Sequence, residues 1–262
     1  MIKLIATDMD GTLLNEQGYL SYEIFDIIKK LNEKDILFAT ASGRQYYNLE
    51  NKFSPVKDDI IYIAENGCYV VNKDTEISSN YLDKKIVKDL IHTARKVDGI
   101  DIVLCGKKAA YIEKDSKEFI NEVEKYYYRY EIVEDLNKVE DDILKFALFD
   151  PKGPEINSNK IFSPLFGDKL LVVVSGKVWL DIINKDINKG IAIKQLQKKY
   201  NIKPEETMVF GDYFNDIDML QSAYHSYAMD NAPEEVKMHA RFIAKSNREN
   251  GVIDVIKSLV LE

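Results

Sequence analysis

The 262-residue sequence has few of the residues on which several protein classes depend. Its two cysteines, Cys68 and Cys105, lie 37 positions apart and lack the partner spacing of a metal site. A disulfide scaffold is therefore not expected, and two free thiols in a reducing cytoplasm are the simpler interpretation. The three histidines, His92, His225 and His239, do not form the pattern of a metal site or a catalytic triad.

Positive charge and long apolar runs are also scarce. Lys and Arg number 36 against 44 Asp and Glu, so the net charge of −8 argues against broad binding of nucleic acid. A metal ion and a few placed cations could still let an acidic chain bind a small phosphorylated molecule. No apolar run approaches the length of a membrane span, and no secretory signal is visible at the N-terminus. We therefore expect a cytoplasmic protein that binds neither nucleic acid nor membrane, as a monomer or small homo-oligomer.

The hydrophobic pattern indicates a sheet domain in two pieces. Short apolar runs end in turns, and helical patterns such as the one after Ser21 alternate with them, which favours a parallel sheet covered on both faces. This pattern stops near residue 80 and returns at 188. The expected strands are 2–7, 36–40, 60–64, 207–210, 226–229 and 241–243. Of the later helices, one runs through Ala192, Ile193, Leu196 and Tyr200, the next carries Ile217, Met219 and Leu220, and the last is the amphipathic run 251–261.

The intervening residues, 81–187, have a mixed pattern that could form its own antiparallel sheet with helices on one face. Helices are expected at 84–96 and 116–128, and strands at 100–104, 109–112, 144–150, 170–174 and 178–183. The predicted fold class is α/β: a Rossmann-like three-layer core with a parallel sheet, formed by 1–80 and 188–262, plus an inserted α/β domain.

Asp8 and Asp10 follow the first strand, two residues apart. Both can project toward the pocket at the carboxyl edge of a parallel sheet. Two carboxylates there repel each other and call for a cation, and oxygen ligands favour Mg²⁺. Gly11 permits a tight turn that the Thr12 hydroxyl can support. The alternative is an acidic pair that only caps this turn.

A second acidic segment, with Asp212, Asn215 and Asp216, follows the apolar strand 207–210 and opens onto the same edge. Taken alone it could be a helix N-cap with acidic residues in the first turn. That alternative is a poor account of two acidic strand ends about 200 residues apart. The two segments together indicate a metal site.

Phosphate could be bound by two further segments. Ser42 and Gly43 offer a hydroxyl and backbone N–H groups after the second strand, although Ser-Gly also forms ordinary turns. Lys189 lies just before a helix, where its ammonium group could meet a phosphoryl group, although most lysines are solvated surface residues.

In order and in residues, these four segments resemble the haloacid dehalogenase-like phosphohydrolases. Asp8-Met9-Asp10-Gly11-Thr12 is similar to motif one, Ser42 within Ala41-Ser42-Gly43-Arg44 to motif two, Lys189 to motif three, and Gly211-Asp212-Tyr213-Phe214-Asn215-Asp216 to motif four. The Cof-type group is closer still, since it shares Glu65-Asn66-Gly67, the approach to Lys189, Met229-Asp230-Asn231-Ala232-Pro233 and Ser246-Asn247…Gly251-Val252. The sequence departs from that group at Asp230, where glycine is usual, and at Cys68, where alanine is common.

The resemblance implies a role for each segment, and an insert of this position and size is that group's cap domain. Asp8 would be the nucleophile, with Asp10 as acid and base and Lys189 as the third catalytic residue. Mg²⁺ would be held by Asp8, Asp10 (through its backbone carbonyl) and Asp212, and Asp216 would orient Lys189 or the metal shell. Phosphate or substrate contacts are expected from Met9, Ser42, Gly43, Arg44, Asn66 and Asn215.

The predicted function is a Mg²⁺-dependent phosphatase acting on a small phosphorylated metabolite, such as a sugar phosphate, through an aspartyl-phosphate. A mutase would share Asp8 and the metal. A phosphorylation-switched binding module would also carry acidic strand ends and a lysine, but without a large insert. A non-catalytic metabolite-binding protein is the third alternative.

Overall fold

The computed structural model describes residues 1–261 and divides the chain into two compact units. The core unit comprises Met1–Ser78 and the residues from Asn188 onward, and the inserted unit comprises Ser79–Ile187. The sequence predicts boundaries after residue 80 and before residue 188. The first lies two residues from the observed boundary, and the second coincides with it. Within the described residues, no helix has the length and apolar character needed to cross a bilayer.

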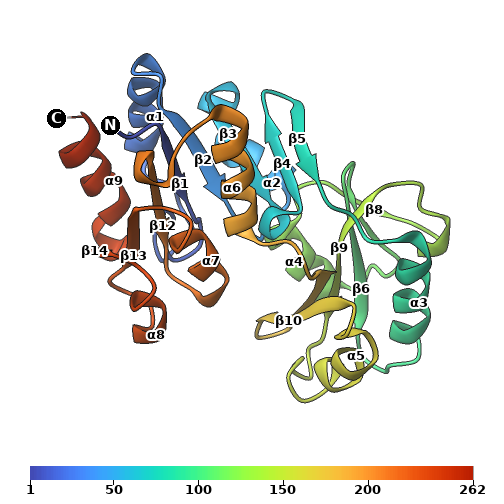
Figure 1. Cartoon of the computed structure of the whole chain (residues 1–262). Helices are drawn as coiled ribbons and strands as arrows, with labels where there is room; N and C mark the ends of the chain where they lie inside the picture. The colour runs from blue at the N-terminus through green and yellow to red at the C-terminus, as the bar shows by residue number, and fades with distance from the viewer. Residues whose placement is uncertain (262) are drawn as a thin grey trace. The chain divides into compact units, whose positions relative to one another are not determined.

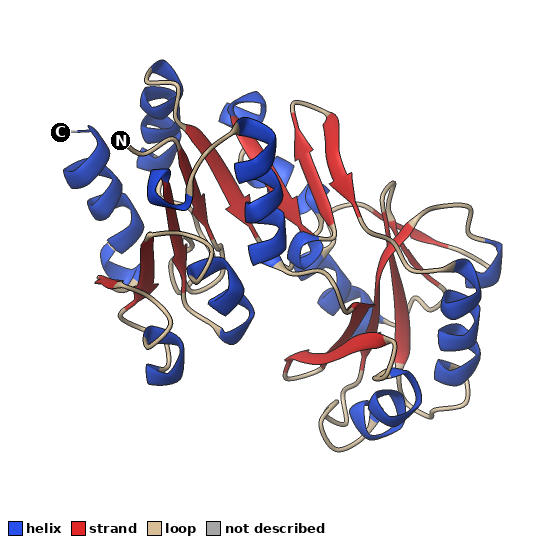
Figure 2. Cartoon of the chain, viewed as in Figure 1, coloured by secondary structure: helices blue, strands red, loops and turns tan. Residues whose placement is uncertain are grey.

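The core unit is built on one sheet of eight strands in the order β14-β13-β12-β1-β2-β3-β4-β5 (Figures 1 and 2). The strands from β14 to β3 are parallel to one another, and β4 pairs antiparallel with β3. The bounds are β1 Leu4–Thr7, β2 Leu37–Ala41, β3 Ile60–Ala64, β4 Tyr69–Asn72, β5 Thr75–Ser79, β12 Thr207–Gly211, β13 His225–Met229 and β14 Phe242–Ala244.

Helices cover both faces of this sheet. One hydrophobic cluster joins the sheet to α1 (Glu23–Glu33), α2 (Tyr46–Lys52) and α9 (Gly251–Ile256). A second cluster, on the opposite face, joins it to α6 (Lys189–Tyr200), α7 (Ile217–Leu220) and α8 (Glu234–Lys237). The predicted three-layer α/β core with a parallel sheet is confirmed.

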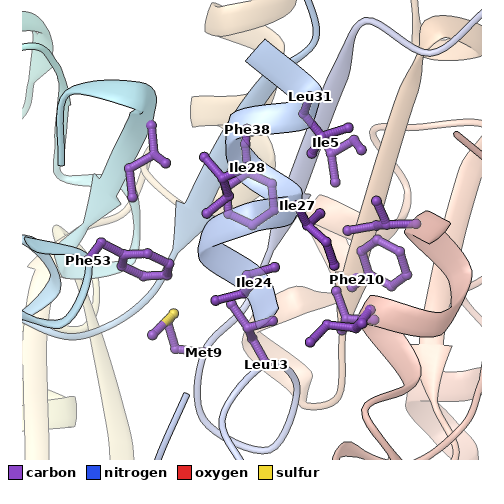
Figure 3. Packing of buried hydrophobic residues seen from close by; sticks show 14 of the residues in the cluster. Ile5, Met9, Leu13, Ile24, Ile27, Ile28, Leu31, Phe38, Phe53 and Phe210 are labelled. Carbon is purple, nitrogen blue, oxygen red and sulfur yellow. The ribbon is translucent and has the colours of Figure 1, made fainter. Parts of the chain in front are cut away.

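Helix α1 shows how the sequence produces this layering. Its buried residues Ile24, Ile27, Ile28 and Leu31 recur at the spacing that puts them on one helical face. Figure 3 shows them packed with apolar side chains of β1, β2 and β12, among them Ile5, Phe38 and Phe210. Burial of each such side chain stabilises the fold by about 1.5–3 kcal/mol.

The inserted unit has a separate six-stranded sheet in the order β10-β11-β9-β6-β7-β8. All of its pairs are antiparallel except β7 with β8, which is parallel. The bounds are α3 Lys84–Ala94, β6 Asp101–Gly106, β7 Ala110–Ile112, α4 Lys117–Tyr126, β8 Tyr130–Ile132, β9 Ile143–Phe149, α5 Ser158–Phe166, β10 Leu170–Gly176 and β11 Trp179–Asn184.

The expectation that helices cover one face of this second sheet is wrong. Successive residues of β6 belong to different clusters: Leu104 packs with α3 and α5, whereas Val103 packs with Phe119 and Val123 of α4. Because successive strand residues point to opposite faces, α4 lies on the face opposite to α3 and α5. The expected antiparallel arrangement is found in the other strand pairs of this sheet, whereas β7 and β8 pair in parallel.

Candidate active site

Adjacent strands β1 and β12 bring the acidic segments of motifs one and four together. Thr7 at the end of β1 is in register with Phe210, and the next residue, Asp8, donates its backbone N–H to the Phe210 carbonyl at 3.0 Å. Asp212 directly follows the end of β12. The two carboxylates therefore meet at the carboxyl edge of the sheet, where ligands bind in open α/β folds.

A buried lysine joins this acidic group. The Nζ atom of Lys189 lies 2.6 Å from Asp8 Oδ1 and 2.7 Å from Asp216 Oδ1, and all three residues are buried. Burial alone disfavours the ammonium charge, but the carboxylates of Asp216 and Asp8 outweigh it and raise the pKa of Lys189. Lys189 is therefore a fixed positive charge, held beside the predicted nucleophile.

Two neighbouring loops fix the position of Lys189. It is the first residue of α6, which is capped by the Asn188 side chain accepting from the Ile191 N–H at 2.8 Å. Gly67 has a φ of +100°, and a Cβ atom there would lie 2.6 Å from the Asn188 carbonyl oxygen. The glycine of Glu65-Asn66-Gly67 thus allows the closest approach of this turn to the start of α6.

Three carboxylates form a group suited to a hard cation. Oxygens of Asp8, Asp212 and Asp216 all lie within 4.8 Å of one another. Burial is the main cause that raises the pKa of Asp8 well above its usual range, and the charges of Asp216 and Asp212 raise it further against the opposing effect of Lys189. Burial also raises the pKa of Asp212 to about 6, although the Thr12 hydroxyl donates to its Oδ1 at 2.7 Å. An all-oxygen, mutually repelling donor set of this kind fits Mg²⁺.

Within this group, Asp216 is already fully engaged. Its Oδ1 accepts from Lys189, and its Oδ2 accepts the backbone N–H groups of Asp212 (3.0 Å) and Tyr213 (3.1 Å). These bonds orient Lys189 and hold the loop that carries Asp212. The geometry therefore favours Asp8 and Asp212 as the direct metal ligands and Asp216 as their support.

The carboxylate of Asp10 does not belong to this group. Its two oxygens accept from Arg44, Oδ2 from Nε at 2.7 Å and Oδ1 from Nη2 at 2.6 Å. Arg44, which was expected to contact substrate, is paired with Asp10 in the structure. A metal contact from Asp10 would have to come from its backbone carbonyl, as the family resemblance implies.

The predicted phosphate-binding residues of three loops, which follow β2, β3 and β12, lie side by side. Ser42 is buried and bonded through its backbone to both Ile63 and Asn66. The Asn66 Oδ1 in turn accepts from the Asn215 Nδ2 at 3.3 Å. A Cβ atom on Gly43 would lie 3.2 Å from the Asn66 amide, so glycine keeps this approach close. Ser42, Gly43, Asn66 and Asn215 therefore form one polar wall.

Met9 and Cys68 both belong to the packed interior. The Met9 side chain has no exposed surface and lies in the cluster under α1, as Figure 3 shows. The predicted substrate contact of Met9 is thus limited to its backbone, whose carbonyl accepts from the N–H groups of the turn that follows. Cys68 is also fully buried, which agrees with a packing role.

The C-terminal part of the chain supplies two site-supporting residues to which sequence reasoning gave no role. Asn231 donates from Nδ2 to the Gly11 carbonyl at 2.8 Å and accepts the Asn247 N–H at 3.1 Å. Asn247 donates to the Leu14 carbonyl at 2.8 Å. Both asparagines lie within the segments shared with the Cof-type group, and that resemblance is the signal that could have found them. Asp230 is largely exposed beside Lys237, so its charge faces solvent.

Comparison with known proteins gives consistent matches over the whole chain. Residues 5–256 match the family described as haloacid dehalogenase-like hydrolase. The chain is 35% identical to the Escherichia coli 5-amino-6-(5-phospho-D-ribitylamino)uracil phosphatase YbjI, over 99% of this chain and 96% of that protein. It is 29% identical to YcsE of Bacillus subtilis, which is also named a 5-amino-6-(5-phospho-D-ribitylamino)uracil phosphatase, over 99% of this chain and 96% of that protein. The crystal structure of SMU.1108c from Streptococcus mutans superposes with a TM-score of 0.89 at 33% identity, covering 100% of both chains.

Proposed function

We propose that this chain, which belongs to the haloacid dehalogenase-like hydrolase family and is a phosphoric monoester hydrolase, releases phosphate from a small phosphorylated metabolite. The proposed substrate is a sugar or sugar-alcohol phosphate, and the proposed cofactor is Mg²⁺. The observation that carries this proposal is the buried Asp8–Lys189–Asp216 arrangement beside Asp212. It combines an anionic nucleophile, a fixed cation and a metal-binding set at one sheet edge.

The proposed reaction has two steps. The Asp8 carboxylate attacks phosphorus and forms an aspartyl-phosphate, while Asp10 protonates the departing oxygen. Asp10 then takes a proton from the water that hydrolyses this intermediate. Lys189 compensates charge on the phosphoryl oxygens, with Ser42, Gly43 and Asn215 donating to them. Asp8 and Asp212 would hold Mg²⁺, which would supply further neutralisation of that charge when bound.

The relatives support the proposed substrate class. The names of YbjI and YcsE both specify a phosphate carried on a ribityl chain, which is an alkyl phosphate of a sugar alcohol. We propose the same bond type for this chain and expect 5-amino-6-(5-phospho-D-ribitylamino)uracil and hexose phosphates to be the informative members of a substrate panel.

The test is a phosphate-release screen over sugar phosphates, nucleotides, flavin mononucleotide, pyridoxal phosphate and the ribitylamino substrate, with Mg²⁺ and with a chelator. Asp8→Asn should abolish turnover. Asp218→Asn is the matched control, because Asp218 carries the same charge at an exposed position two residues beyond the motif-four segment, and an asparagine there keeps an oxygen that can accept from Asn188 Nδ2. Activity of Asp8→Asn equal to that of the unchanged enzyme would refute the nucleophile assignment.

A mutase shares the same nucleophile and metal and must be separated by its product. With a hexose 1-phosphate, the proposal requires free phosphate and hexose. Recovery of an isomeric hexose phosphate in place of free phosphate would overturn it.

A further inference from the structure

Asp10 and Arg44 form an ion pair at the rim of the site. The Asp10 side chain is 54% exposed, whereas that of Arg44 is only 12% exposed. Each carboxylate oxygen accepts from a different nitrogen of the same guanidinium, at 2.7 and 2.6 Å, and keeps a second lone pair on which the proton of a general acid can be carried. Such a bidentate pair fixes the plane and direction of a carboxylate more strictly than a single contact does.

Arg44 itself is held by the loops of the polar wall. Its backbone N–H donates to the Ser42 Oγ at 3.2 Å, and its carbonyl accepts the Glu65 N–H at 3.1 Å. Its Nη1 donates to the Asn48 side chain on α2 at 3.2 Å. The guanidinium is therefore a fixed point to which the more exposed Asp10 is attached.

The geometry of phosphoryl transfer explains why the acid must lie at the rim. The attacking and leaving oxygens are roughly in line on opposite sides of phosphorus. Asp8 is buried, so the leaving oxygen emerges on the solvent side of the phosphoryl group. An acid that protonates this oxygen must be partly exposed, as Asp10 is, and an exposed side chain samples several rotamers unless something restrains it.

We propose that Arg44 is a positioning residue for the general acid Asp10 and not a ligand of the substrate. This inference rests on the proposed function, because it assumes that Asp10 protonates the leaving group. It replaces the expectation that Arg44 contacts the substrate. The guanidinium restrains Asp10 at the rim, and Ser42 connects that restraint to the loop that receives phosphate.

The experiment compares two substrates that differ in their need for an acid. p-Nitrophenyl phosphate releases a stable phenolate and needs little protonation, whereas an alkyl phosphate, such as a sugar phosphate, needs a proton on its leaving oxygen. The measured quantity is kcat/KM, which reports the steps through transfer to Asp8. Arg44→Met should lower it for the alkyl phosphate by about 10–100-fold, mainly through kcat, and by only a few-fold for the aryl phosphate.

Three further variants make the result specific. Asp10→Asn should show the same preference for the aryl substrate, and combining it with Arg44→Met should cause no further loss, because both changes remove one function. Arg44→Lys, which retains charge without the two-pronged contact, should restore part of the alkyl activity. Lys52→Met is the charge control. Burial lowers the pKa of Lys52, and the charge of Arg44 lowers it further against the opposing effect of Asp10, yet Lys52 makes no contact with Asp10 among the described residues. It should leave the ratio between the two substrates unchanged.

Equal losses on both substrates, an increase in KM, and additivity with Asp10→Asn would together show that Arg44 binds substrate, and would overturn the proposal. A failure of the proposed function looks different, because the unchanged enzyme would then hydrolyse neither ester. Loss of the substrate ratio in Lys52→Met as well would show a general charge effect in place of positioning.

Discussion

Replacement of Asp216 by asparagine tests whether this residue holds the site together or binds the metal. The carboxylate has no exposed surface and accepts three hydrogen bonds, one from Lys189 and two from backbone N–H groups. An asparagine has a single acceptor oxygen, which can serve Lys189 or the two N–H groups but not both. The side-chain NH₂ group of the asparagine then faces other hydrogen-bond donors, either Lys189 or the backbone N–H groups of Asp212 and Tyr213.

The expected cost follows from these contacts. A hydrogen bond to a charged group contributes about 1.5–3 kcal/mol, and breaking a buried ion pair from one side costs about 3–5 kcal/mol. We expect Asp216→Asn to lose about 3–5 kcal/mol, because Lys189 keeps Asp8 as its second partner. At about 2–4 °C per kcal/mol, the melting temperature of the core unit falls by roughly 6–20 °C.

The assay is thermal unfolding in a chelating buffer, so that no divalent metal contributes. Asp218→Asn removes the same charge from an exposed neighbouring position and should change stability by less than about 1 kcal/mol. If Asp216→Asn unfolds like the unchanged protein in chelator and loses stability only when Mg²⁺ is present, Asp216 is a metal ligand, and its assignment as the support of Lys189 and the Asp212 loop is refuted.

Two further predictions concern the metal site. Gly11→Ala should weaken Mg²⁺ binding at least tenfold in a calorimetric titration, because its Cβ would lie 2.2 Å from Asp212 Oδ2. Gly18→Ala is the control and should not weaken binding, because Gly18 has a similar positive φ but no atom within 4 Å of the added Cβ. Equal affinities of the two variants would contradict the proposed role of Asp212. Since the pKa of Asp212 is raised to about 6, protons compete with Mg²⁺ below that pH, and affinity should be about tenfold weaker at pH 5 than at pH 7 in the same titration. An affinity independent of pH over this range would show that Asp212 is not a ligand.

The sequence was most informative where a single rule connects residue order to position in space. Apolar runs ending in turns predict the parallel strands, and the carboxyl ends of parallel strands share one edge. That rule is sufficient to predict that Asp8, Asp212 and Ser42 approach one another. Lys189 required the family resemblance, because a lysine before a helix has no distinctive pattern of its own.

Other features depend on loop geometry that residue patterns do not record. The β4–β5 turn has Lys73 and Asp74 at φ angles of +49° and +59°, in place of the Asn-Gly or Gly that normally indicates a hairpin. Helix α5 contains Pro164, which argues against a helix in any propensity estimate. The face covered by α4 could not be deduced either, because amphipathic spacing shows that a helix has an apolar side but not which sheet face it meets.

The position of Asp10 also depends on loop geometry, and residues from both ends of the chain contribute to it. Motif one continues past Asp10 into a turn whose carbonyls at Gly11 and Leu14 accept from Asn231 and Asn247. A net contribution of about 1 kcal/mol from each bond is small for stability but large for the orientation of a short loop. Arg44 restrains the side chain of Asp10 while the two asparagines restrain the backbone beyond it. Residues more than 200 positions apart in the sequence therefore fix one carboxylate, a dependence that the acidic motif alone does not reveal.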